Sequence, residues 1–257
     1  MTGRLTFDFT GKKVLVTGAS SGIGYGVAAA FAAAGAELTI LSDTGAIHEA
    51  AAKLSGSVRA IQCDIANAAQ VTEKLADIGT LDVLVNNAGL ERPTPLTGEN
   101  PEGNATFERI IAINVTGTQN VTDTLVNRIA DGGRIILTAS IWSRTAVPGF
   151  SAYVASKHAN LGLMRTWAQE LGPRRICVNA VCPGWIKTGP AMNSLRELAQ
   201  SSGRTETEVE QEIMSAQAID KLMEPVDISD LYLFLASSGG TNITGQAINI
   251  DRGEVMS

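Results

Sequence analysis

Seven short runs of apolar residues, rich in Val, Ile and Leu, recur along the chain and are separated by stretches of helical character. They lie at 14–17, 38–41, 58–63, 81–85, 134–138, 176–181 and 247–250. Within each run the residues do not alternate between apolar and polar, as they do in strands with one exposed face. Apolar strands that alternate with helices predict a parallel sheet covered on both faces. Right-handed crossovers then predict a seven-stranded, doubly wound α/β (Rossmann) fold.

A glycine-rich turn, TGASSGIG at 17–24, lies between the first predicted strand and an alanine-rich segment at 26–34. This segment predicts a helix that ends at Gly35. The three glycines of the turn allow a tight bend, close approach of a pyrophosphate and close packing of helix on strand. Such a turn after a strand and before a helix predicts a dinucleotide site. Its predicted cofactor-binding residues are Gly18, Ser20, Ser21, Gly22, Ile23 and Gly24.

The second apolar run ends in Ser42 and Asp43, which we predict to lie beside the adenine ribose. An acidic side chain about 20 residues beyond the glycines accepts hydrogen bonds from the ribose hydroxyls and repels a 2′-phosphate. The glycine-rich turn contains no Lys or Arg that would pair with this phosphate. The pattern therefore favours NAD and leaves NADP possible, with an ordinary turn residue as the alternative role of Asp43.

Candidate chemistry follows the fifth predicted strand, which leads into Ser140. The sequence YVASK then places Tyr153 and Lys157 four residues apart, on one face of a helix. A free tyrosine has a pKa of about 10, and a nearby ammonium and an oxidised nicotinamide both favour its ionised form. We therefore predict that Lys157 lowers the pKa of Tyr153, the acid/base, while Ser140 binds the substrate oxygen. This set fits hydride transfer between nicotinamide and a secondary alcohol or ketone.

In order and spacing, these motifs resemble the short-chain dehydrogenase/reductase family, in its single-domain subtype. The resemblance runs essentially end to end and implies one domain over residues 1–257, assembled as a homotetramer. It implies a catalytic set of four residues, Asn114, Ser140, Tyr153 and Lys157. In this family a helix irregularity at the asparagine, here Asn114, would hold a water that is linked to Lys157. Beyond the glycine-rich turn and Asp43, the cofactor-binding residues that it implies are Asp64, Ile65, Asn87, Ala88, Gly89, Tyr153, Lys157, Pro183, Gly184, Ile186 and Thr188.

The resemblance also implies individual roles for three of these cofactor-binding residues. Asp64 would bond the adenine amino group, and Asn87 would bridge two strands beside the cofactor. Thr188 would orient the nicotinamide carboxamide and so decide which ring face offers its hydride.

Polar and aromatic residues follow the fourth, fifth and sixth strands, where a substrate would lie. Cations there could bind a carboxylate, phosphate or sulfonate, and tryptophans could flank a sugar ring or a short carbon skeleton. We therefore favour a sugar, polyol or short hydroxy acid as substrate. The alternatives are an NADPH-dependent 3-oxoacyl-thioester reductase and a non-catalytic dinucleotide-binding sensor. The candidate substrate residues are Glu91, Arg92, Trp142, Arg144 and Trp185, with Leu90, Ile141 and Lys187 beside them.

Between Pro190 and Pro225 there is no apolar strand run, and residues 201–215 predict an amphipathic helix that begins near Thr205. An insertion at about 190–225, between the sixth and seventh strands, is predicted to be a substrate lid.

Composition narrows the partners. The 257 residues carry a net charge of −6, which argues against nucleic-acid binding and favours a small-molecule partner. No apolar stretch has the length of a membrane span or the form of a signal peptide, so we expect a cytoplasmic protein.

The cysteines and histidines suggest no metal site. Three cysteines, without metal-type spacing, are predicted to be buried thiols: Cys63, Cys177 and Cys182. His48 and His158 belong to no ligand cluster and are expected to be packed, so no catalytic metal is predicted.

Overall fold

The computed structural model describes residues 6–97 and 104–256. Seven strands form one parallel sheet in the order β3-β2-β1-β4-β5-β6-β7, which confirms the predicted doubly wound α/β fold. The strands are β1 Lys13–Thr17, β2 Glu37–Ser42, β3 Val58–Gln62, β4 Leu81–Asn86, β5 Ile129–Thr138, β6 Cys177–Pro183 and β7 Ala247–Ile250. Strand β5 begins five residues before the predicted run, because its pairing with β4 shifts register between Leu81 and Val83.

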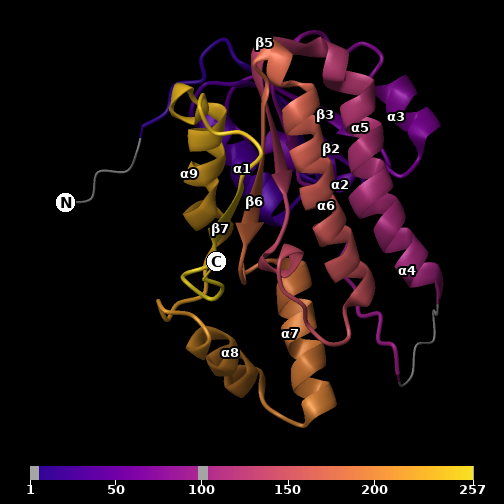
Figure 1. Cartoon of the computed structure of the whole chain (residues 1–257), viewed down its shortest axis with the longest axis vertical. Helices are drawn as coiled ribbons and strands as arrows, with labels where there is room; N and C mark the ends of the chain where they lie inside the picture. The colour runs from indigo at the N-terminus through magenta and orange to yellow at the C-terminus, as the bar shows by residue number, and fades with distance from the viewer. Residues whose placement is uncertain (1–5, 98–103, 257) are drawn as a thin grey trace.

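Helices lie on both faces of the sheet (Figure 1). A hydrophobic core lies on each face, as the apolar runs predicted. Neighbouring residues of one strand enter opposite cores: Leu15 of β1 packs into the first, and Val14 and Val16 pack into the second. The helices of the first core are α3 Ala68–Lys74, α5 Thr118–Leu125 and α6 Ser151–Glu170, and those of the second are α1 Gly22–Ala33, α2 Ala46–Ala52 and α9 Pro225–Ala236.

One helical stretch between β4 and β5 is irregular. Helix α4, Asn104–Ile111, continues into a π-helix at Ala112–Gly117 and then into α5. A Cβ at Gly117 would lie 2.6 Å from Cγ1 of Ile65, so the glycine allows this stretch to approach the loop after β3. π-Helical turns occur often at functional sites, and this one contains Asn114.

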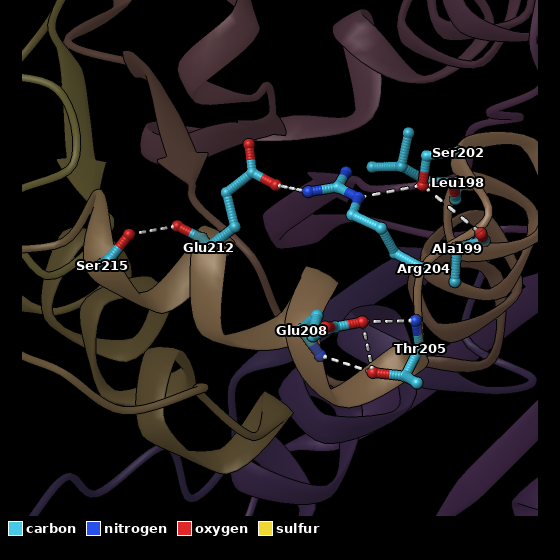
Figure 2. Close-up of polar contacts among 8 residues, drawn as sticks. All are labelled: Leu198, Ala199, Ser202, Arg204, Thr205, Glu208, Glu212 and Ser215. Carbon is cyan, nitrogen blue, oxygen red and sulfur yellow. Dashed lines mark hydrogen bonds and ion pairs between the residues drawn. The ribbon is translucent and has the colours of Figure 1, made fainter.

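The predicted lid contains two helices beyond the carboxyl ends of the strands, α7 Gly189–Ser202 and α8 Glu206–Ser215 (Figure 1). Thr205 caps α8, as predicted: its Oγ1 accepts from the Glu208 amide at 3.2 Å, and its own amide donates to Glu208 Oε2 at 2.8 Å (Figure 2). Sequence reasoning did not separate α7. Its N-cap is Thr188, whose Oγ1 accepts from the Ala191 amide.

Side chains around the turn between α7 and α8 hold the two helices together. Gly203 ends α7 with φ +66. Next to it, Arg204 donates from Nε to Ser202 Oγ at 3.0 Å and pairs through Nη1 with Glu212 (Figure 2). The predicted lid has a small core of its own, against which Trp185 packs; it consists of Leu195, Ala199 and Val209.

Other expectations from the sequence have mixed outcomes. All three cysteines are buried and free, as predicted. The expectation of packed histidines is wrong, because His48 and His158 are both exposed; His158 Nδ1 instead bonds the carbonyl of Val154 one turn earlier. None of the helices formed by residues 6–97 and 104–256 combines the length and the apolar character that a membrane span requires.

Candidate active site

A cavity of about 400 Å³ lies at the carboxyl ends of the strands and extends from the glycine-rich turn to the first turn of α7. Parallel α/β sheets bind ligands at this edge, where strand order reverses. Every residue that the sequence predicted to bind the cofactor lines this cavity. Of the predicted catalytic residues, Ser140, Tyr153 and Lys157 also line it, whereas Asn114 lies behind the wall.

The glycine-rich turn fits a pyrophosphate because no side chain could occupy its inner side. A Cβ at Gly18, whose φ is +65, would lie 2.6 Å from Cα of Ala88, and one at Gly24 would lie 2.2 Å from the oxygen of Gly18. Ser21, the N-cap of α1, makes no side-chain hydrogen bond to the helix. The first amides of α1 therefore remain available to an anion, which a helix N-terminus attracts.

Hydrogen bonds fix this turn against strand β4. Nδ2 of Asn87 donates to the carbonyls of Thr17 and Gly18, at 3.0 and 3.2 Å. Oγ1 of Thr17 accepts from the amides of Asn87 and Ala88, both at 3.0 Å. Asn87 therefore connects β1 with the loop after β4, directly beside the glycines.

The carboxylates of Asp43 and Asp64 lie at one end of the cavity, where β2 and β3 end. Asp43 is exposed and accepts a hydrogen bond from Ser42 Oγ at 3.3 Å, and Ser42 Oγ lies 3.1 Å from Ser20 Oγ. Asp64 accepts from the Ala66 amide at 2.9 Å and from Nη2 of Arg109 at 2.8 Å. Sequence reasoning missed Arg109, because it is distant in the chain and α4 brings it to Asp64 only in the folded protein.

The hydroxyl and ammonium groups of the predicted catalytic set converge at the opposite end of the cavity. Lys157 is 3% exposed, its Nζ donates to the carbonyl of Thr138 at 2.7 Å, and it lies 5.4 Å from the ring centroid of Tyr153. Ser140 begins the short helix Ile141–Ser143 and accepts from the Trp142 amide at 3.2 Å. One helix and one strand end therefore place the three groups in the same cavity.

The pKa values of this pair differ from the sequence expectation. Burial raises the pKa of Tyr153, the charge of Glu91 raises it further, and a hydrogen bond with Ser140 acts in the opposite direction. The expected net lowering of the Tyr153 pKa is therefore not found in the protein by itself, because desolvation dominates. Burial lowers the pKa of Lys157 to about 8, and the charge of Glu91 opposes this shift.

Asn114 is fully buried and bonded at both ends of its amide. Its Oδ1 accepts from the Leu90 amide at 2.7 Å, and its Nδ2 donates to the Leu90 carbonyl at 3.0 Å and to Ser156 Oγ at 2.9 Å. A Cβ at Gly89 would lie 3.4 Å from Asn114 Oδ1 and 3.6 Å from Lys157 Nζ. Asn114 thus holds the loop that follows β4 next to Lys157.

The substrate candidates separate into two groups. Glu91, Arg92, Trp142 and Trp185 line the cavity, together with Leu90 and Ile141. The expectation that Arg144 and Lys187 lie beside the substrate is not met. The Arg144 guanidinium donates to the carbonyl of Ala247 in β7, and Lys187 pairs with Glu224 at 3.5 Å, so neither side chain lines the cavity.

Aromatic rings form one wall of the substrate end. The ring of Trp142 lies 5.9 Å from that of Tyr153 and 6.3 Å from that of Trp185, both in edge-to-face orientation. Trp185 also packs against the small core of the predicted lid, so the wall continues from Tyr153 to these helices.

Comparison with known proteins establishes the family. The family model described as "Enoyl-(Acyl carrier protein) reductase" matches residues 18–254. The chain is 32% identical over 257 residues to the D-beta-hydroxybutyrate dehydrogenase of Cupriavidus necator, and the match covers 95% of this chain and 98% of that one. The chain belongs to the short-chain dehydrogenase/reductase family.

Solved structures of this family superpose closely on the chain. L-sorbose reductase from Gluconobacter frateurii, complexed with NADPH and L-sorbose, has a TM-score of 0.88 at 26% identity and covers 98% of this chain and 100% of its own. The 3-ketoacyl-(acyl-carrier-protein) reductase from Brucella melitensis, complexed with NADH, has a TM-score of 0.82 at 27% identity, with coverage of 97% and 100%. This chain is thus a short-chain dehydrogenase/reductase, an oxidoreductase of alcohol and keto groups that uses a pyridine nucleotide.

Proposed function

We propose that this short-chain dehydrogenase/reductase transfers a hydride between NAD(H) and a polar secondary alcohol or its ketone, such as a sugar, polyol or short hydroxy acid. The observation that carries the proposal is the convergence of Ser140, Tyr153 and Lys157 on the cavity that the glycine-rich turn begins. When bound, the nicotinamide supplies or accepts the hydride. The chain itself supplies binding, orientation and the proton.

The three side chains divide the proton chemistry. The Ser140 hydroxyl holds the substrate oxygen, and the Tyr153 hydroxyl gives or takes the proton on that oxygen. Lys157 is held by the carbonyl of Thr138 beside the tyrosine ring, so its ammonium favours the tyrosinate. Since burial raises the pKa of Tyr153, this ammonium and the positive charge of an oxidised nicotinamide must together offset desolvation.

Charge near the adenosine supports NAD as the cofactor. The charged side chains that line the cavity near the glycine-rich turn are the carboxylates of Asp43 and Asp64. Arg109 is paired with Asp64. A 2′-phosphate next to Asp43 would therefore meet a like charge, whereas ribose hydroxyls would find an acceptor.

The alternative function is that of an NADPH-dependent 3-oxoacyl-thioester reductase, which shares the catalytic set. The similarity to the 3-ketoacyl-(acyl-carrier-protein) reductase from Brucella melitensis favours the thioester substrate, although that protein is complexed with NADH. Initial rates with NADH and NADPH, measured with an acetoacetyl thioester and with a panel of sugars, polyols and hydroxy acids, separate the two functions. The dinucleotide sensor is disfavoured, because the chain keeps both Tyr153 and Lys157 in place.

The acid/base role is tested with Tyr153→Phe, followed by NADH absorbance on the same panel. Turnover should fall by at least about a hundredfold, which is the low end of an acid/base contribution, while the affinity for NADH stays within about twofold. Tyr25→Phe removes the same hydroxyl from α1, outside the cavity, and should leave both quantities unchanged. Full turnover by Tyr153→Phe would refute the mechanism.

A further inference from the structure

The substrate end of the cavity contains a carboxylate that the proposed chemistry does not use. Glu91 follows β4, lines the cavity, and is half-buried. Its Oε1 accepts one hydrogen bond, from Ser194 Oγ of α7 at 3.0 Å. Within residues 6–97 and 104–256, no Lys or Arg forms an ion pair with it. Burying a carboxylate without a cationic partner is costly unless a ligand supplies the charge.

The charges that act on Glu91 come from several elements. Burial raises the pKa of Glu91. The hydrogen bond from Ser194 and the positive charges of Lys157 and Arg92 lower this pKa, and the negative charge of Glu197 raises it. Arg92 is exposed, and its Nη1 donates to the backbone carbonyl of Glu91 at 2.9 Å. Nζ of Lys157 already donates to the carbonyl of Thr138 and lies over the ring of Tyr153.

Glu91 also acts on the catalytic tyrosine. Its negative charge raises the pKa of Tyr153, which opposes the formation of the tyrosinate that alcohol oxidation needs. A neutral substrate would leave this opposing charge in place. A cation bound to Glu91 would cancel it next to the reacting hydroxyl, so binding of the substrate would itself help to activate Tyr153.

The surroundings of Glu91 suit a cation. Trp142 and Trp185 line the same end of the cavity, with ring centroids 6.3 Å apart. Aromatic faces attract ammonium groups, most strongly those of tryptophan. A carboxylate and two indole rings that line one end of the cavity could offer an ammonium group both an ionic and a cation–π contact.

Resting on the proposed hydride transfer, we propose that the physiological substrate is a secondary alcohol or ketone that carries an ammonium group near the reacting carbon, bound by Glu91 at the end of the cavity that Trp142 and Trp185 line. Amino alcohols, amino polyols and the corresponding amino ketones form this class. Ser194 of α7 donates to the same carboxylate, so α7 is connected through Glu91 to the proposed ammonium site.

The test compares 1-amino-2-propanol with 1,2-propanediol, which replaces the ammonium by a hydroxyl, as substrates at neutral pH with NAD. The wild-type kcat/KM should favour the amine at least tenfold. Glu91→Gln keeps the shape and can still accept from Ser194, and should reduce this preference to about twofold, mainly through KM. Glu91→Asp keeps the charge and should retain part of the preference. Glu197→Gln removes the same charge from an exposed position of α7 and should keep all of it.

Equal use of the two compounds by the wild type, or an undiminished preference in Glu91→Gln, would overturn the assignment and leave the hydride-transfer proposal standing. If no compound of the panel is turned over, hydride transfer fails instead. Calorimetric titration of the NADH-saturated protein with the same pair then decides the ammonium site. Tighter binding of the amine that is lost in Glu91→Gln supports the site, and equal binding of the two compounds refutes it.

Discussion

Replacement of Gly24 by alanine is the most direct test of how the glycine-rich turn works. The added Cβ would lie 2.2 Å from the carbonyl oxygen of Gly18 and 2.4 Å from Nδ2 of Asn87. Real Cβ contacts essentially never fall below 3.0 Å, and the nearest atom is backbone, so the turn itself must move. The Asn87–Gly18 hydrogen bond, now 3.2 Å, would be displaced with it.

Overpacking of this kind costs about 1–3 kcal/mol of unfolding free energy. For a chain of this size each kcal/mol corresponds to about 2–4 °C in Tm. Because the same displacement moves the amides that would cradle the pyrophosphate, the Kd for NADH should rise at least about tenfold, or about 1.4 kcal/mol. Thermal unfolding and a fluorescence titration with NADH measure the two effects.

Gly162→Ala is the matched control. Gly162 is exposed in α6, and its added Cβ meets nothing within 4 Å. A helical Gly-to-Ala change at such a site should stabilise the protein by about 1 kcal/mol and leave NADH binding unchanged. Unfolding of Gly24→Ala at the wild-type temperature, together with wild-type affinity for NADH, would refute this role of Gly24.

Three further changes test other parts of the site. Asp43→Ala should narrow the ratio of NAD to NADP activity, and an unchanged ratio would mean that another residue reads the ribose. Asn114→Ala removes the bonds to Leu90 and should lower Tm by the equivalent of about 1–3 kcal/mol and reduce kcat; wild-type values of both would contradict its anchoring role. The pKa of Lys157 is depressed to about 8, so between pH 8 and 10 the folded state binds fewer protons than the unfolded one. Wild-type unfolding free energy should therefore rise relative to Lys157→Met across that window, by about 1–3 kcal/mol, and a constant difference in denaturant titrations would disprove it.

Much of the fold and the cofactor end of the site could be predicted, because both depend on local signals. Apolar runs mark the strands, and glycines between a strand and a helix mark the turn. Thr205 and Glu208 mark the start of α8 through a capping box that lies within four residues. The substrate end was predicted less well. Arg144 lies only two residues beyond Trp142 after the end of β5, and only the folded chain directs it to β7 instead of the cavity.

The sequence by itself determined the parallel sheet, the glycine-rich turn and the spacing that places Tyr153 and Lys157 on one helix face, because each depends on periodicity or on bonds within a few residues. The tertiary structure alone decided the pairing of Arg109 with Asp64 and the direction of the pKa shift of Tyr153. Desolvation and charge act through space between residues that are distant in the chain. Both require knowledge of which groups the fold brings together and how much water it leaves between them.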